Sequence, residues 1–437
     1  MKTKQLKKDK VNVVTLGCSK NQVDSENLIT QLKHGKYDVV HNTDDDDSNI
    51  VVINTCGFIG DAKAESVDTI LHFAKMKSDG DLDKVYVTGC LSERYKDDLV
   101  KEIPEVDAYF GTTELPQLLK KFNIDYKHEL LGERRPTDND HFSYLKIAEG
   151  CTRTCAFCAI PLMRGKHQSR EMQDIVDEAM FLAQNGVKEI ILISQELTFY
   201  GLDYYKTRKL AELLERLVEV PGIEWIRLHY TYPGKFPKEV IDVMAKHEKI
   251  CNYLDMPLQH ASNAVLDRMN RHTTTDEARE LIEYAREKIP NLAVRTTFLV
   301  GFPGETDEEF DELLDFVQEM KFDRVGVFEY SHEEDTRAYV MQDDVPAEIK
   351  RMRANQIMEV QREISLEKNE AKLDTVIKVL FDRKDGDHFV GRTESDSPEV
   401  DNEVLVDASS SFIRVGDFAK VRVTDVTEYD LYGELDY

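Results

Sequence analysis

Three cysteines stand within eight residues of the chain, in the run Cys151-Thr-Arg-Thr-Cys155-Ala-Phe-Cys158. Thiolates are soft ligands suited to iron-sulfur clusters or zinc, and ligation deprotonates them. Three cysteine ligands on a four-iron cluster leave one iron open to a small molecule, as a catalytic metal site keeps one position free. The run therefore predicts a catalytic metal centre with these three cysteines as ligands. The alternative is structural zinc with His167 as a fourth ligand, although Cys₃His zinc sites are usually built from two separated ligand pairs.

Three more cysteines each follow a short run rich in β-branched residues. The runs are 11–17, 50–55 and 85–89, and the cysteines that follow them are Cys18, Cys56 and Cys90. Helix-like segments at 22–34 and 61–77 separate the runs, which predicts βα units of a parallel sheet. Because the carboxyl ends of parallel strands share one edge, where ligands bind, the three thiols should converge there.

Lone cysteines at strand ends are often inert core residues, so one such cysteine would carry little information. Here three occupy the same end of three strands, and each has a neighbouring glycine: Gly17, Gly57 and Gly89. Glycine allows the backbone to approach a bound group closely. We therefore expect the three cysteines to form a second catalytic, three-ligand cluster site.

The seventh cysteine, Cys251, stands at the start of a predicted strand and has no nearby partner in the sequence. We interpret it as a buried small residue. An odd number of cysteines in a long chain favours metal ligation or redox chemistry over a disulfide framework.

A second series of βα units follows a polar stretch from about 132 to 141, which contains Pro136 and is interpreted as a linker. Six candidate strands alternate with helical segments, and this alternation predicts six βα units in a partial barrel. The strands are expected at 144–148, 189–194, 225–230, 253–256, 293–300 and 325–330, and helices at 171–184, 210–219, 275–288 and 307–320. The first three-cysteine run follows the first strand, at the mouth where such barrels carry their chemistry.

The last part of the chain differs from the two series of βα units in the elements that its sequence predicts. A long charged helix is expected at 347–371, followed by short strands at 376–381, 404–406 and 418–426, which predicts a small antiparallel barrel. Such a barrel usually suggests RNA, but the segment from Glu370 to Tyr437 holds 17 Asp or Glu against 8 Lys or Arg. The predicted fold class is α/β, with domains at 1–131, 132–370 and 371–437.

Composition narrows the classes of partner. A chain of 437 residues with 41% hydrophobic residues can bury two or three cores. The lysine-rich start is followed by an apolar run too short for a signal segment, and no stretch approaches the ~18 to 20 apolar residues of a membrane helix, so we expect a cytoplasmic protein without membrane contact. The formal net charge of -27 does not favour direct nucleic-acid binding.

Six runs of the sequence, together with the order of the modules, resemble the methylthiotransferase family of the radical S-adenosylmethionine superfamily. The runs are Leu16-Gly-Cys-Ser-Lys-Asn21, Glu149-Gly-Cys151, Ala159-Ile-Pro-Leu-Met-Arg-Gly-Lys-His-Gln-Ser-Arg170, Asp255-Met-Pro-Leu-Gln-His260, Arg295-Thr-Thr-Phe-Leu-Val-Gly-Phe-Pro-Gly-Glu305 and Val325-Gly-Val-Phe-Glu-Tyr-Ser331. The resemblance covers nearly the whole chain. It implies an N-terminal parallel α/β domain with a cluster site, a TIM-like (βα)₆ radical core with a C-terminal linker helix, and a small antiparallel barrel called TRAM.

The same resemblance implies the cofactors and the reaction. They are two 4Fe-4S clusters, one for each set of three cysteines, and two molecules of S-adenosylmethionine per product. The residues of the six runs are similar to those of one branch of the family. That branch transfers a methylthio group to the β-carbon of an aspartate in ribosomal protein uS12. That branch needs uS12 as substrate, an electron donor and a sulfur source.

Candidate contacts to S-adenosylmethionine follow from position alone. They are Phe157 between the cluster ligands, Gln195 and Glu196 after the second barrel strand, and Gly301 and Gly304 in the turn after the fifth. Gly and Pro also mark any tight βα turn. The side chains of Gln195 and Glu196 could equally cap the next helix. The family usually has Asp where this chain has Glu196.

Two alternative functions stay open at this point. The same chemistry on a tRNA adenosine should be accompanied by a basic C-terminal module and a salt-dependent affinity for RNA. An iron-sulfur electron carrier without catalysis should have fully ligated clusters, whereas three cysteines per site leave open irons.

Overall fold

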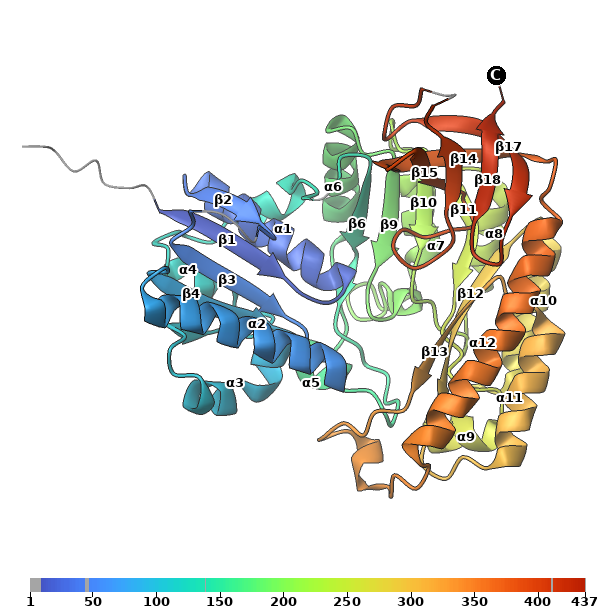
Figure 1. The fold of residues 1–437 in the computed structure, drawn as a ribbon, viewed down its shortest axis with the longest axis horizontal. Coiled ribbons are helices and arrows are strands. Elements are labelled where there is room, and N and C mark those ends of the chain that lie inside the picture. Colours follow the sequence, from blue (N-terminus) through green and yellow to red (C-terminus); the bar gives the residue numbers. More distant parts are fainter. Residues whose placement is uncertain (1–8, 44–46, 138, 410–411, 437) are drawn as a thin grey trace, which may run out of the picture. The chain divides into compact units, whose positions relative to one another are not determined.

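The computed structural model describes residues 9–43, 47–137, 139–409 and 412–436 (Figure 1). The lysine-rich residues 1–8 lie outside this part of the chain. Two compact units form: the first comprises 1–138, 144–152 and 159–185, and the second comprises 139–143, 153–158 and 186–437. The three-domain boundaries expected from the sequence stay a prediction. No helix within the described ranges is long and apolar enough to cross a membrane.

A five-stranded parallel sheet in the order β2-β1-β3-β4-β5 forms the centre of the first unit. Its strands are β1 Lys10–Thr15, β2 Asp38–His41, β3 Ile50–Thr55, β4 Lys84–Gly89 and β5 Ala108–Tyr109. Every residue of the central strand β3 is buried, as its continuous apolar run requires when helices cover both faces. The strands that precede the three cysteines are neighbours in this sheet.

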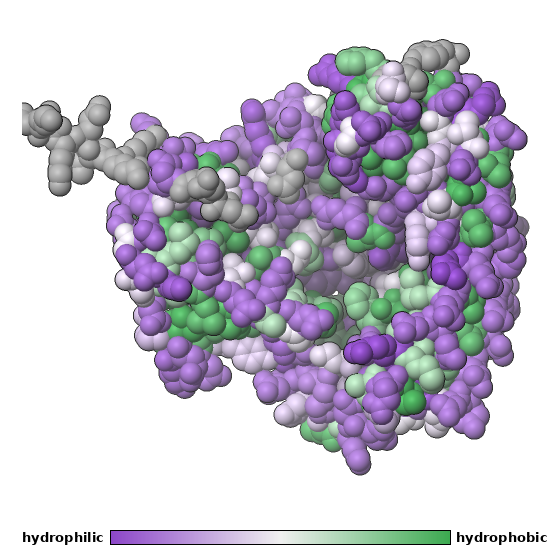
Figure 2. Space-filling model, in the orientation of Figure 1, coloured by the Kyte–Doolittle hydropathy of each residue, from purple (hydrophilic) through white to green (hydrophobic). Residues whose placement is uncertain are grey.

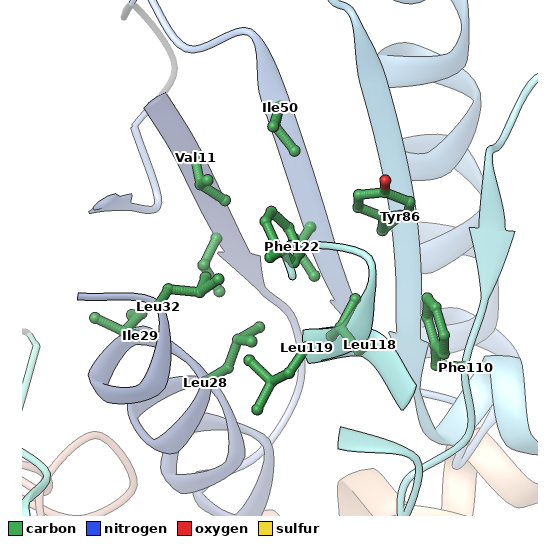
Figure 3. Close-up of a cluster of buried hydrophobic side chains, with 12 residues drawn as sticks. Val11, Leu28, Ile29, Leu32, Ile50, Tyr86, Phe110, Leu118, Leu119 and Phe122 are labelled. Carbon is green, nitrogen blue, oxygen red and sulfur yellow. The ribbon is translucent and has the colours of Figure 1, made fainter. Parts of the chain in front are cut away.

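Helices pack on both faces of the sheet (Figure 1). Successive side chains of a strand point to opposite faces, so Ile50 contributes to one core and Val51 to the other. Figure 3 shows the first core, in which Val11 and Ile50 face Leu28 and Leu32. The helices of this core are α1 Ser19–His34 and α4 Leu115–Lys120, and those of the second are α2 Gly60–Asp79 and α3 Cys90–Glu102.

The stretch that the sequence suggests as a linker is firmly anchored over part of its length. Arg134 is fully buried, and its guanidinium forms ion pairs with Glu26 of α1 and with Glu178 of α6 (Met172–Gln184), the latter at 2.6 Å. Buried charges of opposite sign therefore fix Arg134 within the first unit, and the chain passes to the second unit later in the same stretch. This unit also holds η1 His128–Glu133, α5 Ile160–Arg164 and the antiparallel pair β7 Ala148–Glu149 and β8 Gln168–Ser169.

The strands of the second sheet lie in space in the order β13-β12-β11-β10-β9-β6, so that strands successive along the chain are neighbours. This order confirms the expected partial barrel. Its strands are β6 Phe142–Lys146, β9 Glu189–Ile193, β10 Trp225–Leu228, β11 Ile250–Asp255, β12 Ala293–Val300 and β13 Arg324–Glu329. The helices are η2 Leu197–Phe199, α7 Leu210–Leu217, α8 Lys238–Lys246, α9 Asn263–Arg268, α10 Thr275–Lys288, α11 Asp307–Met320, η3 Arg337–Val340 and α12 Ala347–Glu370. Capping boxes at Thr274 and Thr306 fix the starts of α10 and α11 at the predicted residues.

The chain ends in a closed five-stranded barrel. Its strands are β14 Val376–Asp385, β15 His388–Arg392, β16 Val404–Asp407, β17 Phe418–Val426 and β18 Leu431–Leu435. Four of the pairings are antiparallel as expected, and the β16–β18 pairing is parallel.

One loop of this barrel, residues 393–403, pairs with arginines of the six-stranded sheet. Nε of Arg324, the first residue of β13, donates to Asp396 at 3.0 Å, and Nε of Arg295 in β12 lies 3.3 Å from Asp401. The side chains of Asp396 and Asp401 are almost fully buried. The loop therefore supplies buried carboxylates to arginines of β12 and β13.

Candidate functional site

The three N-terminal cysteines lie at one edge of the first sheet. Cys18 is the N-cap of α1 and follows β1, Cys56 directly follows β3, and Cys90 is the first residue of α3 after β4. Because β1, β3 and β4 are adjacent and parallel, their carboxyl ends bring the three cysteines to the same edge, as the sequence predicts. Cys18 is exposed, whereas Cys56 and Cys90 are buried.

The glycines beside these cysteines have a sharper role than the sequence suggests. A Cβ on Gly17 would lie 2.7 Å from Cβ and 2.9 Å from Sγ of Cys56. A Cβ on Gly57 would lie 2.8 Å from the backbone nitrogen of Leu91, and one on Gly89 2.5 Å from the carbonyl oxygen of Thr55. The glycines thus let the three cysteine loops pack against one another, which is the close approach that a shared cluster site needs.

Asn21 connects the loops, and sequence reasoning from the cysteines alone missed it. This fully buried residue donates from Nδ2 to the carbonyl oxygens of Leu16 and Thr55, at 2.7 and 3.1 Å. Its Oδ1 faces Sγ of Cys90 at 3.8 Å and accepts a hydrogen bond from Arg164. The available signal was its place at the end of the run Leu16–Asn21, three residues beyond Cys18.

Burial and helix geometry act on these thiols in opposite directions. Burial raises the pKa of Cys56, and it raises the pKa of Cys90 to about 11, while the positive charge of Arg164 opposes both shifts. The amino end of α3 also favours negative charge on Cys90. A cysteine that ligates a metal is a thiolate, so a metal ion bound here would displace protons and supply the positive charge that a buried thiolate requires.

The Cys151–Cys158 run is divided between the two units. In the first unit the backbone N–H of Cys151 donates to the carbonyl of Gly165 at 3.0 Å. In the second unit the backbone N–H of Cys158 donates to the carbonyl of Cys155 at 3.2 Å, and Nη1 of the buried Arg271 lies 3.5 Å from Sγ of Cys155. Each set of three cysteines therefore has one thiol in contact with a buried arginine.

Three of the five predicted cofactor contacts lie around this loop. Phe157 packs against a cluster that includes Phe302, which stands inside the turn from Gly301 to Gly304. Both glycines of the turn have positive φ, and a Cβ on Gly301 would lie 2.2 Å from the side chain of Lys350. The structure thus brings Phe157 and the glycine turn together at one end of the barrel.

Glu196 has internal partners. It is 2% exposed, accepts from Nε and Nη2 of Arg153 at 2.8 and 2.6 Å, and caps η2 by accepting from the backbone N–H of Thr198 at 2.8 Å. The capping alternative is confirmed for Glu196, because its carboxylate fixes a helix start. Its second partner, Arg153, stands between Cys151 and Cys155, so Glu196 also holds the cysteine loop. Gln195 precedes it at the end of β9.

The remaining candidates have ordinary surroundings. Nε2 of His167, the possible fourth zinc ligand, lies 3.2 Å from Oγ of Ser169. Within the described residues, no three His, Cys, Asp or Glu side chains are grouped to hold a single metal ion. Cys251 is 0% exposed in the core of the second unit, which confirms its interpretation as a buried residue.

Comparisons with known families match three consecutive parts of the chain. Residues 10–111 match Uncharacterized protein family UPF0004, residues 145–317 the Radical SAM superfamily, and residues 375–435 the TRAM domain. Among solved structures, the radical S-adenosylmethionine methyltransferase TsrM from Kitasatospora setae has a TM-score of 0.54 at 16% identity, over 74% of this chain and 73% of that one. The radical enzyme OxsB has a TM-score of 0.53 at 13% identity, over 80% and 56%. These likenesses show the fold.

Curated relatives match over the full length. Ribosomal protein uS12 methylthiotransferase RimO of Flavobacterium johnsoniae is 59% identical over 99% of this chain and 100% of its own. Proteins of the same name are 56% identical in Cytophaga hutchinsonii, over 100% of both chains, and 48% in Bacteroides thetaiotaomicron, over 98% and 99%. With both cysteine sets at the expected strand ends, the chain belongs to the RimO family of radical S-adenosylmethionine methylthiotransferases.

Proposed function

We propose that the chain methylthiolates the β-carbon of an aspartate in ribosomal protein uS12, using two 4Fe-4S clusters and S-adenosylmethionine. The observation that carries the proposal is the 59% identity with a uS12 methylthiotransferase over 99% of the chain. The convergence of Cys18, Cys56 and Cys90 at one sheet edge supports it, since a radical enzyme that only cleaves S-adenosylmethionine needs one set of three cysteines. We place the reaction in the cytoplasm, where ribosomal proteins are found.

The donor sets fit the two clusters. Cys151, Cys155 and Cys158 would hold one cluster, and Cys18, Cys56 and Cys90 the other. When bound, the first cluster with S-adenosylmethionine supplies a radical that can remove hydrogen from an unactivated carbon, and the second supplies a place to hold sulfur. The protein's own residues position these groups and exclude water.

Around the first cluster, the chain supplies packing and fixed charges. Phe157 covers one side of the Cys155–Cys158 turn as part of a hydrophobic cluster. The pair of Arg153 and Glu196 holds the loop between Cys151 and Cys155. We propose Phe157, Gln195 and the turn from Gly301 to Gly304 as contacts to S-adenosylmethionine, with Glu196 acting through Arg153.

The charge of the C-terminal barrel does not by itself identify the partner. Much of its acidic excess is paired internally, as with Asp396 and Asp401. Among the most exposed residues the two signs occur in nearly equal number, while further acidic side chains, such as those of Asp417 and Asp436, are partly exposed. The exposed acidic residues are Asp374, Asp385, Asp387, Glu399, Asp407, Asp425 and Glu434, and the exposed basic ones are Lys378, Arg383, Lys384, Arg414, Lys420 and Arg422. The assignment of uS12 therefore rests on the relatives.

The decisive experiment incubates the reconstituted, reduced protein anaerobically with S-adenosylmethionine, sulfide, uS12 and bulk tRNA, and then measures the mass of both macromolecules. A methylthio mass gain on uS12 alone is expected. A gain on tRNA alone would move the chain to the tRNA-modifying branch, and cluster reduction without cleavage of S-adenosylmethionine would indicate an electron carrier.

Cysteine variants separate the two sites in the same assay. Replacing Cys151, Cys155 or Cys158 by Ala should abolish cleavage of S-adenosylmethionine. Replacing Cys18, Cys56 or Cys90 by Ala should leave cleavage possible and stop methylthio transfer. Normal product from a variant of the second set would contradict a second catalytic cluster.

A further inference from the structure

A buried arginine reaches the N-terminal cysteine site from the segment that follows the radical motif. Arg164 ends α5, and its side chain is 2% exposed. Its Nε donates to Sγ of Cys90 at 3.3 Å, and its Nη2 donates to Oδ1 of Asn21. Its Nη1 pairs with Asp24 at 2.6 Å and with Glu149 at 3.2 Å. Each nitrogen of the guanidinium thus has a defined partner, and one partner is a cluster cysteine.

The hydrogen bonds of Asn21 fix the orientation of its side-chain amide. Both carbonyls bound by Nδ2 of Asn21, those of Leu16 and Thr55, can only accept hydrogen bonds. Oδ1 of Asn21 must therefore face Arg164, whose nitrogens can only donate. Arg164 thereby contacts Cys90 directly and reaches the loops of the other two cysteines through a single amide.

The carboxylates around Arg164 bind its Nη1 atom, and its Nε–H is directed at the sulfur of Cys90. Asp24 and Glu149 bind the Nη1 side, and both also pair with Lys146, the latter at 2.7 Å. Two cations and two anions offset one another in this quartet. The edge that points at Cys90 is a cationic N–H donor, and burial strengthens its effect on a nearby sulfur.

This geometry has a definite consequence for a bound iron-sulfur cluster. Reduction adds negative charge to the cluster and its ligand sulfurs. Hydrogen bonds to the sulfurs and nearby positive charge stabilise the reduced state, and these are among the factors that set cluster potentials.

We propose that Arg164 is a positioning residue of the N-terminal cluster, whose N–H···S hydrogen bond to Cys90 and fixed charge raise the reduction potential of that cluster. The inference rests on the proposed function, because it requires a cluster on Cys18, Cys56 and Cys90. A merely structural arginine would affect stability or iron content and leave the potential unchanged.

The test uses the full chain with Cys151, Cys155 and Cys158 replaced by Ala, so that the N-terminal cluster is the one observed. Arg164→Met and Arg164→Lys are made in this background, reconstituted anaerobically and titrated with electron paramagnetic resonance as the readout. Lys146→Met is the matched control, since the ammonium group of Lys146 binds the same two carboxylates as Arg164, those of Asp24 and Glu149, rather than a cysteine.

We expect the reduction potential of the N-terminal cluster to be highest in the parent, lower in Arg164→Lys and lowest in Arg164→Met. Lys146→Met should shift this potential less than Arg164→Met does. In the enzyme with all six cysteines, Arg164→Met should slow methylthio transfer roughly 10-fold to 100-fold, the usual loss for a partner of a metal ligand.

An unchanged potential in Arg164→Met, or an equal shift in Lys146→Met, would overturn the proposal. If Arg164→Met binds no iron, Arg164→Lys decides, because it keeps the charge and loses the Nε donor. A parent that binds no iron would refute the second cluster and the role of Arg164 with it.

Discussion

Gly17 offers the sharpest test of how the cysteine loops are packed. Its φ is +87°, and a Cβ would lie 2.7 Å from Cβ of Cys56, where carbon atoms in contact are normally about 3.5 to 4.0 Å apart. Gly17→Ala should therefore push Cys56 away by about 1 Å or strain the turn. Positive φ costs an alanine about 1 to 2 kcal/mol and overpacking typically about 1 to 3, so the sum is about 2 to 5 kcal/mol.

Gly80 is a matched control for this change. It ends α2 with φ +89°, and a Cβ there would meet nothing within 4 Å. Gly80→Ala pays the same backbone strain, about 1 to 2 kcal/mol, without the steric overlap. Both substitutions restrict the unfolded chain equally, so the difference between them isolates the contact with Cys56.

The assay compares the denaturant midpoint and the iron content of the two variants with those of the parent. We expect Gly17→Ala to lower the midpoint more than Gly80→Ala and to lose iron from the N-terminal site, while Gly80→Ala keeps its iron. Equal midpoints and equal iron in both variants would refute the conclusion that Gly17 is required for close approach of the loops.

Three further predictions concern buried groups. Arg134→Met should destabilise the fold by about 3 to 5 kcal/mol in denaturant unfolding, because it leaves Glu26 and Glu178 buried without the cation between them. Lys101→Met, which removes the exposed ion pair with Asp98, should have little effect on the free energy of unfolding. Burial would raise the pKa of Asp396, but Arg324 and Lys372 lower it below its usual value. Its stabilising effect is thus complete above the unfolded pKa of about 3.9 and is lost as pH falls through the lower folded pKa. The difference between the midpoints of the parent and Asp396→Asn should therefore be steady from about pH 5 to 8 and shrink as pH falls below about 4; a difference that does not shrink in this acid range would count against the pairing. Burial raises the pKa of Cys251 to about 12, so iodoacetamide should label Cys18 and spare Cys251 in the folded, iron-free protein at neutral pH, as peptide mass analysis would show.

The sequence predicted the architecture well because its signals are local. Strand β12 and helices α10 and α11 begin and end where apolar periodicity and capping residues indicate. The positions of Cys18, Cys56 and Cys90 followed from a general property of parallel sheets. Such inferences need neither side-chain contacts nor long-range packing.

The partners of the cysteines could not be predicted in the same way. Arg164 and Cys90 are 74 residues apart, and Arg271 and Cys155 116 residues apart, so only the folded chain reveals that each arginine contacts a thiol. The buried ion pairs of Arg134 could not be predicted for the same reason, since its carboxylate partners lie 108 and 44 residues away. The charge count of the last 68 residues could not show which acidic residues, such as Asp396, are paired inside the fold. Figure 2 shows hydrophilic residues prevailing on the visible face.

The loop 393–403 bears on how this protein can be shortened or recombined. A chain cut before β14 would lose Asp396 and Asp401, and Arg324 and Arg295 would lose these counter-ions inside the six-stranded sheet. Chimaeras that exchange the C-terminal barrel between relatives would need to carry this loop together with the arginines it pairs with.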